Sequence, residues 1–193
     1  MEGRKQSPNP ERLELLNTLA VAIKMGLQKE GQLHLRFVCT HNARRSQLSQ
    51  IICFALAKTH RLNISTSSAG THKTQVHPTV AKTLNHLGFR TEKALAPPAE
   101  YLIYFAEDQE PIPVFSKTLK EASGDGQSFW AVMVCEQADA QCPFVPGASH
   151  RSVLSYADPG EKDGTDQALL AYLSTARSII TEWQWMLQKI IAP

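Results

Sequence analysis

A strand-like run that passes through a short polar loop directly into a helix is the feature that most constrains how this chain can fold. Residues 33–39, LHLRFVC, alternate and end apolar, as a strand with a buried end does, and residues 46–60, SQLSQIICFALAKTH, carry apolar side chains at helical spacing. The loop at 39–46 therefore joins the C-terminal end of a strand to the N-terminus of a helix. In an open parallel sheet, ligands bind beyond that end of the strands.

The rest of the chain repeats this alternation. We expect further strands in RLNISTSSAG, which closes on Gly70, in the continuous apolar run FWAVMVC and in SVLSYA at 152–157, and helices near 10–30, 77–88 and 166–191. Residues 91–128 mix Pro, Gly and charge around one apolar run, YLIYF, and are expected to be irregular. Strands alternating with helices predict an α/β fold of three layers, in which a central parallel sheet of about four strands is flanked by helices.

Length and composition bound the class of protein. The 193 residues fit a single domain, 1–193, which includes an N-terminal helix at about 10–30. The net charge is only +2 and no Lys/Arg stripe stands out, so nucleic acid is not an expected partner. No apolar run approaches membrane-spanning length and the N-terminus lacks a signal-peptide pattern. We therefore expect a cytoplasmic protein with no membrane partner.

The cysteines are informative by their spacing. Cys39, Cys53, Cys135 and Cys142 are too far apart for a secreted disulfide scaffold, and in a reducing compartment they suggest chemistry. The last two have no Cys or His pair nearby, so no zinc site is predicted, and no other metal or cofactor either. Cys53 lies within IICFAL and is expected to pack in the core.

The loop at 39–46 has the features of an oxyanion site. Its amides can converge on an anion at a helix N-terminus, where the peptide dipoles add positive potential. Arg45 supplies a fork of donors that matches a tetrahedral oxyanion, and the same field favours thiolate over thiol at Cys39. The Ser46 hydroxyl can donate a hydrogen bond to that sulfur. The expected oxyanion-binding residues are Thr40, His41, Asn42, Ala43, Arg44, Arg45 and Ser46.

The motif alone leaves a simpler alternative open. A bare Cys-x5-Arg match is common by chance, and free cysteine is among the most buried residue types. Cys39 can therefore also be a buried cysteine at the end of a strand. Its place between a strand and a helix favours the catalytic interpretation.

Longer stretches resemble a known superfamily. The loop VCTHNARRSQ is similar to the active-site loop of the low-molecular-weight protein tyrosine phosphatases and of the thioredoxin-coupled arsenate reductases that share their fold. SSAGTHKTQVHPTVAKTLNHLGF resembles their second strand and helix, and YADPG resembles their acidic loop, in the family's order from about residue 33 to 160. The resemblance implies that Asp158 is the general acid and that the Asn42 side chain braces the loop.

The chain departs from that family at several points. His41 stands where the family usually has Gly, and Arg44 where it often has a second cysteine. Either side chain can change the charge at the mouth of the loop or point to solvent. The N-terminal helix and the region 91–128 exceed the family's compact core.

Two stretches separate the reductases from the phosphatases. VMVCEQADAQCPFVPG, with Cys135 at the end of a strand and Cys142 before Pro143, is similar to the redox pair of the arsenate reductases. Phosphatases of this fold usually place tyrosines directly after Asp-Pro, whereas Gly160 and Glu161 stand here. The resemblance therefore favours an arsenate reductase-type enzyme with arsenate as substrate and a thioredoxin-like reductant.

The chemistry implied by this resemblance is a relay. Cys39 attacks arsenate, Asp158 protonates the departing oxygen, Cys135 then attacks the Cys39 sulfur, and Cys142 attacks Cys135. A thioredoxin-like partner reduces the resulting bridge. Because a disulfide needs Cα atoms within roughly 7 Å, a helix or turn between the last two cysteines must loosen.

Two other functions remain open from the sequence. A low-molecular-weight phosphatase would hydrolyse phosphotyrosine or small phosphate esters with Cys39, Arg45 and Asp158, leaving Cys135 and Cys142 as redox protection or as an inert core and surface thiol. A non-catalytic module that binds phosphate or protein is the third interpretation, and the substitutions in the loop are the features that would support it.

Overall fold

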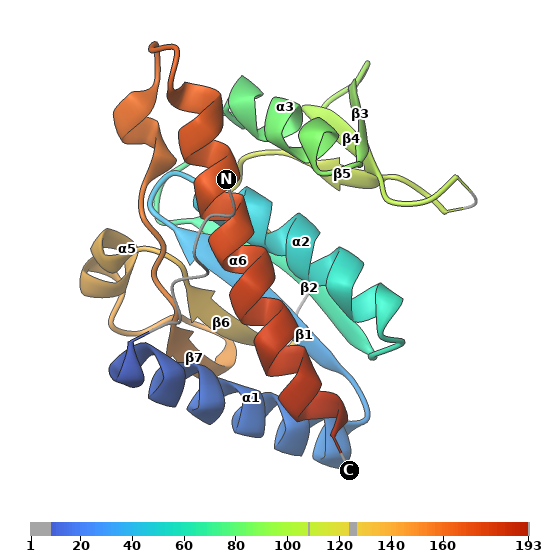
Figure 1. Ribbon diagram of the computed structural model, residues 1–193, viewed down its shortest axis with the longest axis vertical. Helices are drawn as coiled ribbons and strands as arrows, with labels where there is room; N and C mark the ends of the chain where they lie inside the picture. The colour runs from blue at the N-terminus through green and yellow to red at the C-terminus, as the bar shows by residue number, and fades with distance from the viewer. Residues whose placement is uncertain (1–8, 108, 124–126, 193) are drawn as a thin grey trace, which may run out of the picture.

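The fold is built around a four-stranded parallel sheet. The computed structural model describes residues 9–107, 109–123 and 127–192 (Figure 1). The strands are β1 (Leu33–Cys39), β2 (Ile64–Gly70), β6 (Phe129–Met133) and β7 (Ala148–Val153), in the order β2-β1-β6-β7, and every neighbouring pair is parallel. The predicted α/β fold with a central parallel sheet is confirmed.

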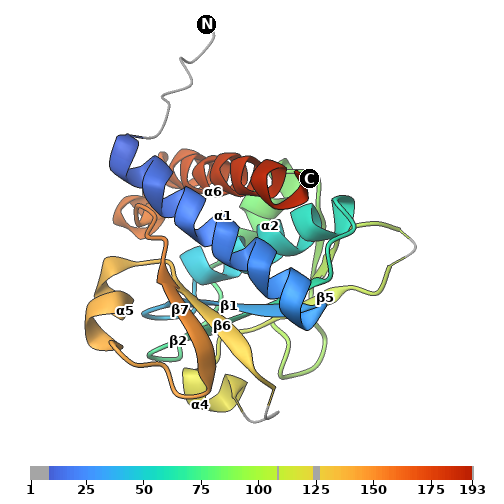
Figure 2. The ribbon, with the colours of Figure 1, turned by 90° about the horizontal axis from the view of Figure 1, so that it is seen from below.

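Long helices cover one face of this sheet. Figure 2 shows α1 (Pro10–Glu30), α2 (Arg45–Thr59) and α6 (Ala168–Ile191) on one side and the short α4 (Leu119–Ala122) on the other. The remaining helices are α3 (Pro78–His86), α5 (Glu136–Gln141) and the 3-10 turn η1 (Pro159–Lys162). The T-shaped contact between the rings of Phe37 and Trp183, 5.6 Å apart, lies where the sheet meets α6. None of the described helices is long and apolar enough to cross a membrane.

The predicted N-terminal helix is present with the predicted ends. The Asn9 side chain accepts a hydrogen bond from the backbone amide of Arg12, Pro10 occupies the first turn, and Gly31 ends the helix in the left-handed region with φ of 74°. The predictions for β1, β2, α2, α3, β6 and α6 also hold to within a few residues. The capping residues, proline and glycine in the sequence therefore predicted the ends of α1 well.

The prediction that residues 91–128 are irregular is wrong. They contain most of a second, antiparallel sheet of β3 (Arg90–Lys93), β4 (Tyr101–Tyr104) and β5 (Ile112–Val114), followed by α4. The apolar run YLIYF forms the central strand, in which Ile103 is buried. These strands have three or four residues, and their pairing depends on contacts with α3 and with each other, which a local pattern does not reveal. Figure 1 shows this sheet beside α3, at the upper right and above α2 in that view.

The last strand was predicted a few residues too far toward the C-terminus. It spans Ala148–Val153, whereas the sequence pattern placed it at 152–157. β7 is an edge strand with no fully buried residue, so its polar sequence, ASHRSV, carries no apolar run. The apolar side chains of Leu154 and Tyr156 follow it, where their amides still donate to the carbonyls of Met133 and Val134.

Candidate active site

The loop between β1 and α2 holds the sulfur of Cys39 at the N-terminus of α2. Cys39 is buried, and its Sγ lies 3.1 Å from the hydroxyl of Ser46. That hydroxyl accepts a hydrogen bond of 2.9 Å from Nδ2 of Asn42, so its own proton is free to point at the sulfur. The structure thus brings together three of the residues singled out in the sequence.

Asn42 connects the loop to a distant part of the chain. Its φ is 49°, in the left-handed region that asparagine tolerates better than most residues. Its Oδ1 accepts a hydrogen bond of 2.9 Å from the amide of Lys117, and its carbonyl accepts one of 2.9 Å from the side chain of Gln47. The same glutamine donates to the carbonyl of Phe115 at 3.1 Å. The loop is therefore braced by the segment that follows β5.

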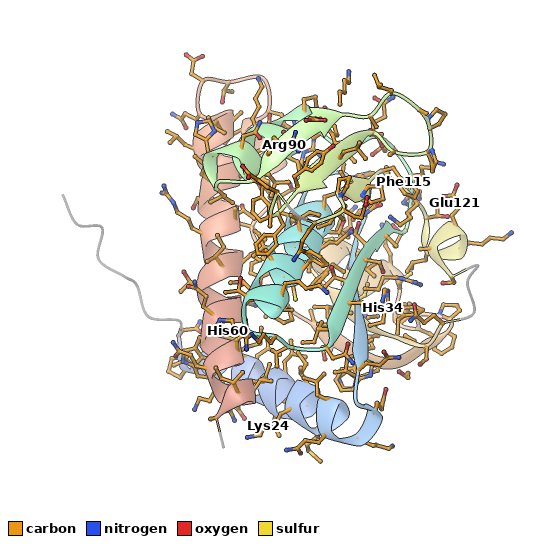
Figure 3. The ribbon with its side chains drawn as sticks, turned by 90° about the vertical axis from the view of Figure 1, so that its right-hand side faces the viewer. Lys24, His34, His60, Arg90, Phe115 and Glu121 are labelled. Carbon is orange, nitrogen blue, oxygen red and sulfur yellow. The ribbon has the colours of Figure 1, made fainter. Side chains whose placement is uncertain are left out.

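This brace was not foreseen from the sequence. Ser116 is buried, its hydroxyl donates to the carbonyl of His41 at 3.1 Å, and Figure 3 shows Phe115 between the antiparallel sheet and Glu121 of α4. Burial lowers the pKa of Lys117, next to Phe115, to about 8. No local motif marks residues 115–117, because their role depends on the fold of the antiparallel sheet that precedes them.

The end of β2 leaves room only for glycine. A Cβ at Gly70 would lie 2.8 Å from the amide nitrogen of Asn42 and 2.8 Å from the carbonyl oxygen of Thr40, closer than Cβ atoms come to backbone. The chain then continues along the loop, with the amide of His72 donating to the Thr40 carbonyl at 2.8 Å. The loop is thus held from the β2 side by direct backbone contact.

Arg45 and Asp158 form an ion pair beside the loop. The guanidinium lies 2.5 Å from Oδ2 of Asp158 and also donates to the carbonyl of Tyr156 at 3.3 Å. A pocket of about 400 Å³ adjoins the pair. An incoming oxyanion therefore meets a guanidinium that is already paired with a carboxylate, and protonation of that carboxylate would remove the competition. The pocket is lined by Arg45, Glu136, Gln137, Ser155, Tyr156, Ala157, Asp158 and Glu161.

Cys135 and Cys142 occupy the two ends of α5. Cys135 is 1% exposed and caps the helix, with its sulfur 3.4 Å from the amide of Ala138. The same sulfur lies 3.5 Å from the hydroxyl of Thr40, the residue that follows Cys39. Cys142 is the C-terminal cap and is partly exposed, and all four cysteines are free thiols. One cysteine therefore touches the loop and the other reaches the surface.

The two unusual loop residues have different surroundings. His41 is exposed, and its ring centroid lies 6.3 Å from that of His72. Arg44 turns away from the loop: its Nε donates to the Tyr172 hydroxyl at 2.7 Å and its NH2 group pairs with Asp163. Burial, and the hydrogen bond to Asp163, raise the pKa of Tyr172, which keeps that hydroxyl protonated. The Arg44 side chain is therefore engaged with Tyr172 and Asp163 and not with the loop.

The remaining candidates have plain structural settings. Ala43 is buried, and its carbonyl accepts the amide hydrogen of His77 at 3.0 Å. Cys53 is fully buried in α2, where burial raises the pKa of its thiol. Among the described residues, no three His, Cys, Asp or Glu side chains are grouped to hold a metal ion.

Comparison with known proteins gives a family for part of the chain and a fold for most of it. The family described as low molecular weight phosphotyrosine protein phosphatase matches residues 34–105, which include the loop from Cys39 to Arg45. No curated protein sequence matches the chain.

Several solved structures share the fold. A low molecular weight protein tyrosine phosphatase from Bacillus subtilis is 15% identical with a TM-score of 0.56, and the match covers 82% of this chain and 97% of that one. An arsenate reductase in the phosphate binding state is 17% identical with a TM-score of 0.55 over 82% of this chain and 99% of its own. The YwlE arginine phosphatase, in a C7S mutant with a phosphorylated active-site serine, is 18% identical with a TM-score of 0.53 over 81% and 95%. Identities this low show the fold alone. The chain is therefore similar to the low-molecular-weight phosphotyrosine phosphatases in sequence over residues 34–105 and in fold over most of its length.

Proposed function

We propose that this protein is an arsenate reductase-type enzyme that uses Cys39, Cys135 and Cys142 as a thiol relay and a thioredoxin-like dithiol as reductant. The observation that carries the proposal is the placement of the second and third thiols. The Cys135 sulfur lies 3.5 Å from the hydroxyl of Thr40, the residue that follows Cys39 in sequence, while Cys142 is partly exposed at the other end of the same short helix. Hydrolysis of a phosphate ester does not require such a pair.

The first step would form a bond between sulfur and arsenic. The Cys39 thiolate attacks arsenate held by the loop amides and Arg45, and one arsenate oxygen leaves as water after Asp158 donates a proton. The Ser46 hydroxyl, 3.1 Å from the sulfur, stabilises the thiolate before attack. Asp158 carries this proton before the attack, and while it is protonated its ion pair with Arg45 is broken, which frees the guanidinium to bind the arsenate.

The second step would reduce the arsenic. Cys135, as thiolate, attacks the Cys39 sulfur, and the electron pair of the sulfur–arsenic bond passes to arsenic, which leaves as arsenite. Cys142 then attacks the Cys135 sulfur and releases the Cys39 thiolate. The Cys135–Cys142 disulfide is finally reduced by the two thiols of the partner, whose own disulfide balances the reaction.

The alternative function is hydrolysis of phosphate monoesters through a phosphocysteine at Cys39. The pairing of Arg45 with Asp158 beside the loop favours it, since nucleophile, cation and acid suffice for that reaction without the other thiols. Phosphate and arsenate have the same shape and charge, so one loop can accept both. Pro159, Gly160 and Glu161 follow the acid, which offers no aromatic side chain to hold a phenyl ring.

The deciding experiment compares the two reactions on the same variants. We expect arsenate-dependent oxidation of thioredoxin in the wild type, its loss in Cys135→Ser and Cys142→Ser, and retained hydrolysis of p-nitrophenyl phosphate in both. Cys39→Ser should lose both reactions. Cys53→Ser is the matched control and should lose neither, because that thiol is buried in α2. A wild type that hydrolyses the ester but oxidises no thioredoxin would select the phosphatase.

A further inference from the structure

We propose that Arg12 and Arg44 are positioning residues for Asp158. They hold the two ends of the segment 155–163, called here the acid segment, against the rest of the molecule. The inference rests on the proposed role of Asp158 as proton donor. It assigns a function to the N-terminal helix, which lies outside the region 34–105 matched by the phosphatase family.

Arg12 holds the beginning of the acid segment. Its guanidinium forms two hydrogen bonds of 2.8 Å to the carboxylate of Glu182 on α6 and donates one of 2.9 Å to the carbonyl of Ser155. The Arg12 and Glu182 side chains are only 22% and 12% exposed, so solvent screens the pair weakly. The guanidinium also lies 5.3 Å from the ring centroid of Tyr156. One arginine on α1 thus contacts two consecutive residues of the acid segment.

Arg44 holds the other end. It pairs with Asp163 and donates to the hydroxyl of Tyr172, and that hydroxyl in turn donates to the second oxygen of Asp163 at 2.9 Å. The imidazole of His77 lies 3.5 Å from the same carboxylate. The tyrosine is fully buried on α6, so the closed triangle of donors and acceptors is anchored in the core.

The middle of the acid segment rests on Arg44 as well. A Cβ at Gly160 would lie 2.9 Å from Nε and 3.0 Å from Cζ of Arg44, and 3.1 Å from Oδ1 of Asp158. The Gly160 amide donates to that same oxygen at 3.0 Å. Since Arg45 pairs with Asp158, two consecutive loop residues contact the turn that carries the acid. The position of the carboxyl group is therefore tied to the nucleophile loop.

This arrangement has a consequence for proton transfer. A general acid must lie within hydrogen-bond reach of the departing oxygen, and the acid segment has few backbone hydrogen bonds of its own beyond the turn at η1. Side-chain contacts at both ends order the acid segment before the substrate binds, so the reaction itself loses less conformational entropy. Loosening either end should therefore reduce protonation of the leaving group more than it reduces attack by Cys39.

The test compares kcat on two phosphate esters that differ in their leaving group. Phenol, with a pKa of about 10 like that of tyrosine, needs a proton as it leaves, whereas p-nitrophenol leaves readily as an anion. Asp158→Asn is the reference and should lower kcat for phenyl phosphate roughly 100-fold more than for p-nitrophenyl phosphate. Arg12→Met and Arg44→Met should lower both rates, with a loss on phenyl phosphate roughly tenfold larger. Arg177→Met, which removes an exposed arginine of α6, is the control and should leave the ratio unchanged.

Further variants separate positioning from loss of charge or of folding. Gly160→Ala removes no charge but crowds Arg44, and should shift the ratio in the same direction as Arg44→Met. Asp163→Asn should do the same, with partial recovery in Asp163→Glu. The rate of Cys39 alkylation should stay within about twofold of the wild type in all of them, since the nucleophile is intact.

The outcomes distinguish this inference from the proposed function. If Asp158→Asn leaves the ratio of the two rates as it is in the wild type, Asp158 is no proton donor and the proposed mechanism fails with the inference. If Asp158→Asn shifts the ratio while Gly160→Ala and both arginine variants do not, the mechanism stands and the inference is overturned. A wild type that acts on neither ester nor on arsenate overturns both.

Discussion

Replacing Ala140 with glycine should make the Cys135–Cys142 disulfide easier to form. Ala140 is an exposed residue of α5, and the two cysteines cap the ends of this helix. At about 1.5 Å of rise per residue, seven steps separate their Cα atoms by roughly 10 Å, whereas a disulfide needs less than about 7 Å. The bridged form must therefore have lost α5, so the equilibrium between thiols and disulfide includes the stability of the helix.

The size of the effect follows from helix propensity. Glycine costs about 0.5–1 kcal/mol more than alanine in a helix, and only the reduced form of the protein contains this one. The whole cost therefore shifts the equilibrium toward the disulfide, by roughly twofold to fivefold. For a two-electron couple this corresponds to a reduction potential about 10–20 mV more negative.

A second variant tests the same helix from outside. Arg151, on β7, donates to the carbonyl of Cys142 at 3.0 and 3.2 Å and pairs with Asp139, and thereby holds the C-terminal end of α5. Because this ion pair is partly exposed, its loss in Arg151→Gln should destabilise α5 by about 1 kcal/mol. We therefore expect this variant to shift the equilibrium toward the disulfide about as much as Ala140→Gly does. The Ala140→Gly and Arg151→Gln effects need not add, since both act on one short helix.

The assay is equilibration in glutathione buffers, followed by alkylation of free thiols and mass spectrometry. It is done in a Cys39→Ser background, so that only the pair at α5 exchanges. Gln184→Gly is the matched control, because it places a glycine at an exposed position of α6 and should leave the potential unchanged. An unchanged or more positive potential in Ala140→Gly would refute the reasoning, since the bridge would then form with the helix intact.

Three further predictions follow from the loop and its brace. Gly70→Ala should destabilise the protein by about 1–3 kcal/mol in urea unfolding and abolish activity, because the added Cβ meets loop backbone; full activity would show that the loop can shift freely. Ser46→Ala should slow alkylation of Cys39 at neutral pH by roughly tenfold, through loss of a hydrogen bond to the thiolate, and an unchanged rate would assign that hydroxyl to Asn42 alone. Lys117 has a folded-state pKa of about 8 against an ordinary 10.5, so the unfolded chain binds the extra proton between these values. The free energy of unfolding should accordingly rise from about pH 8 to 10.5 relative to Lys117→Met, and parallel pH curves for the two proteins would contradict this.

The elements that could be predicted are those with strong local signals. Pro10 and Gly31 marked the ends of α1, and the continuous apolar run at 129–135 marked β6, because a strand buried on both faces needs no polar alternation. β7 was misplaced and β3 to β5 were missed, since edge strands and strands of three or four residues are selected by their partners. Such half-exposed strands are too short or too polar to show a regular alternation of polar and apolar residues.

The features of the candidate site also divide into those that the sequence predicted and those that it did not. Sequence by itself determined the loop at 39–46, because the strand, the loop and the helix that form it are consecutive in the chain. It also placed Cys135 at the end of a buried strand, and it left a helix or a turn open between the last two cysteines, where the structure has α5. These relations are local, so the chain order already contains them.

Only the tertiary structure decided what holds that loop and its acid in place. Lys117 meets Asn42, Arg12 meets Ser155, and Arg44 meets Asp163, across 75, 143 and 119 positions of sequence respectively. Each contact is a hydrogen bond or ion pair whose partners are chosen by where the helices and strands pack, and a polar residue in the sequence does not reveal its distant partner. The arginine in place of a cysteine therefore looked like a change at the anion site, whereas packing turned its side chain toward the acid segment.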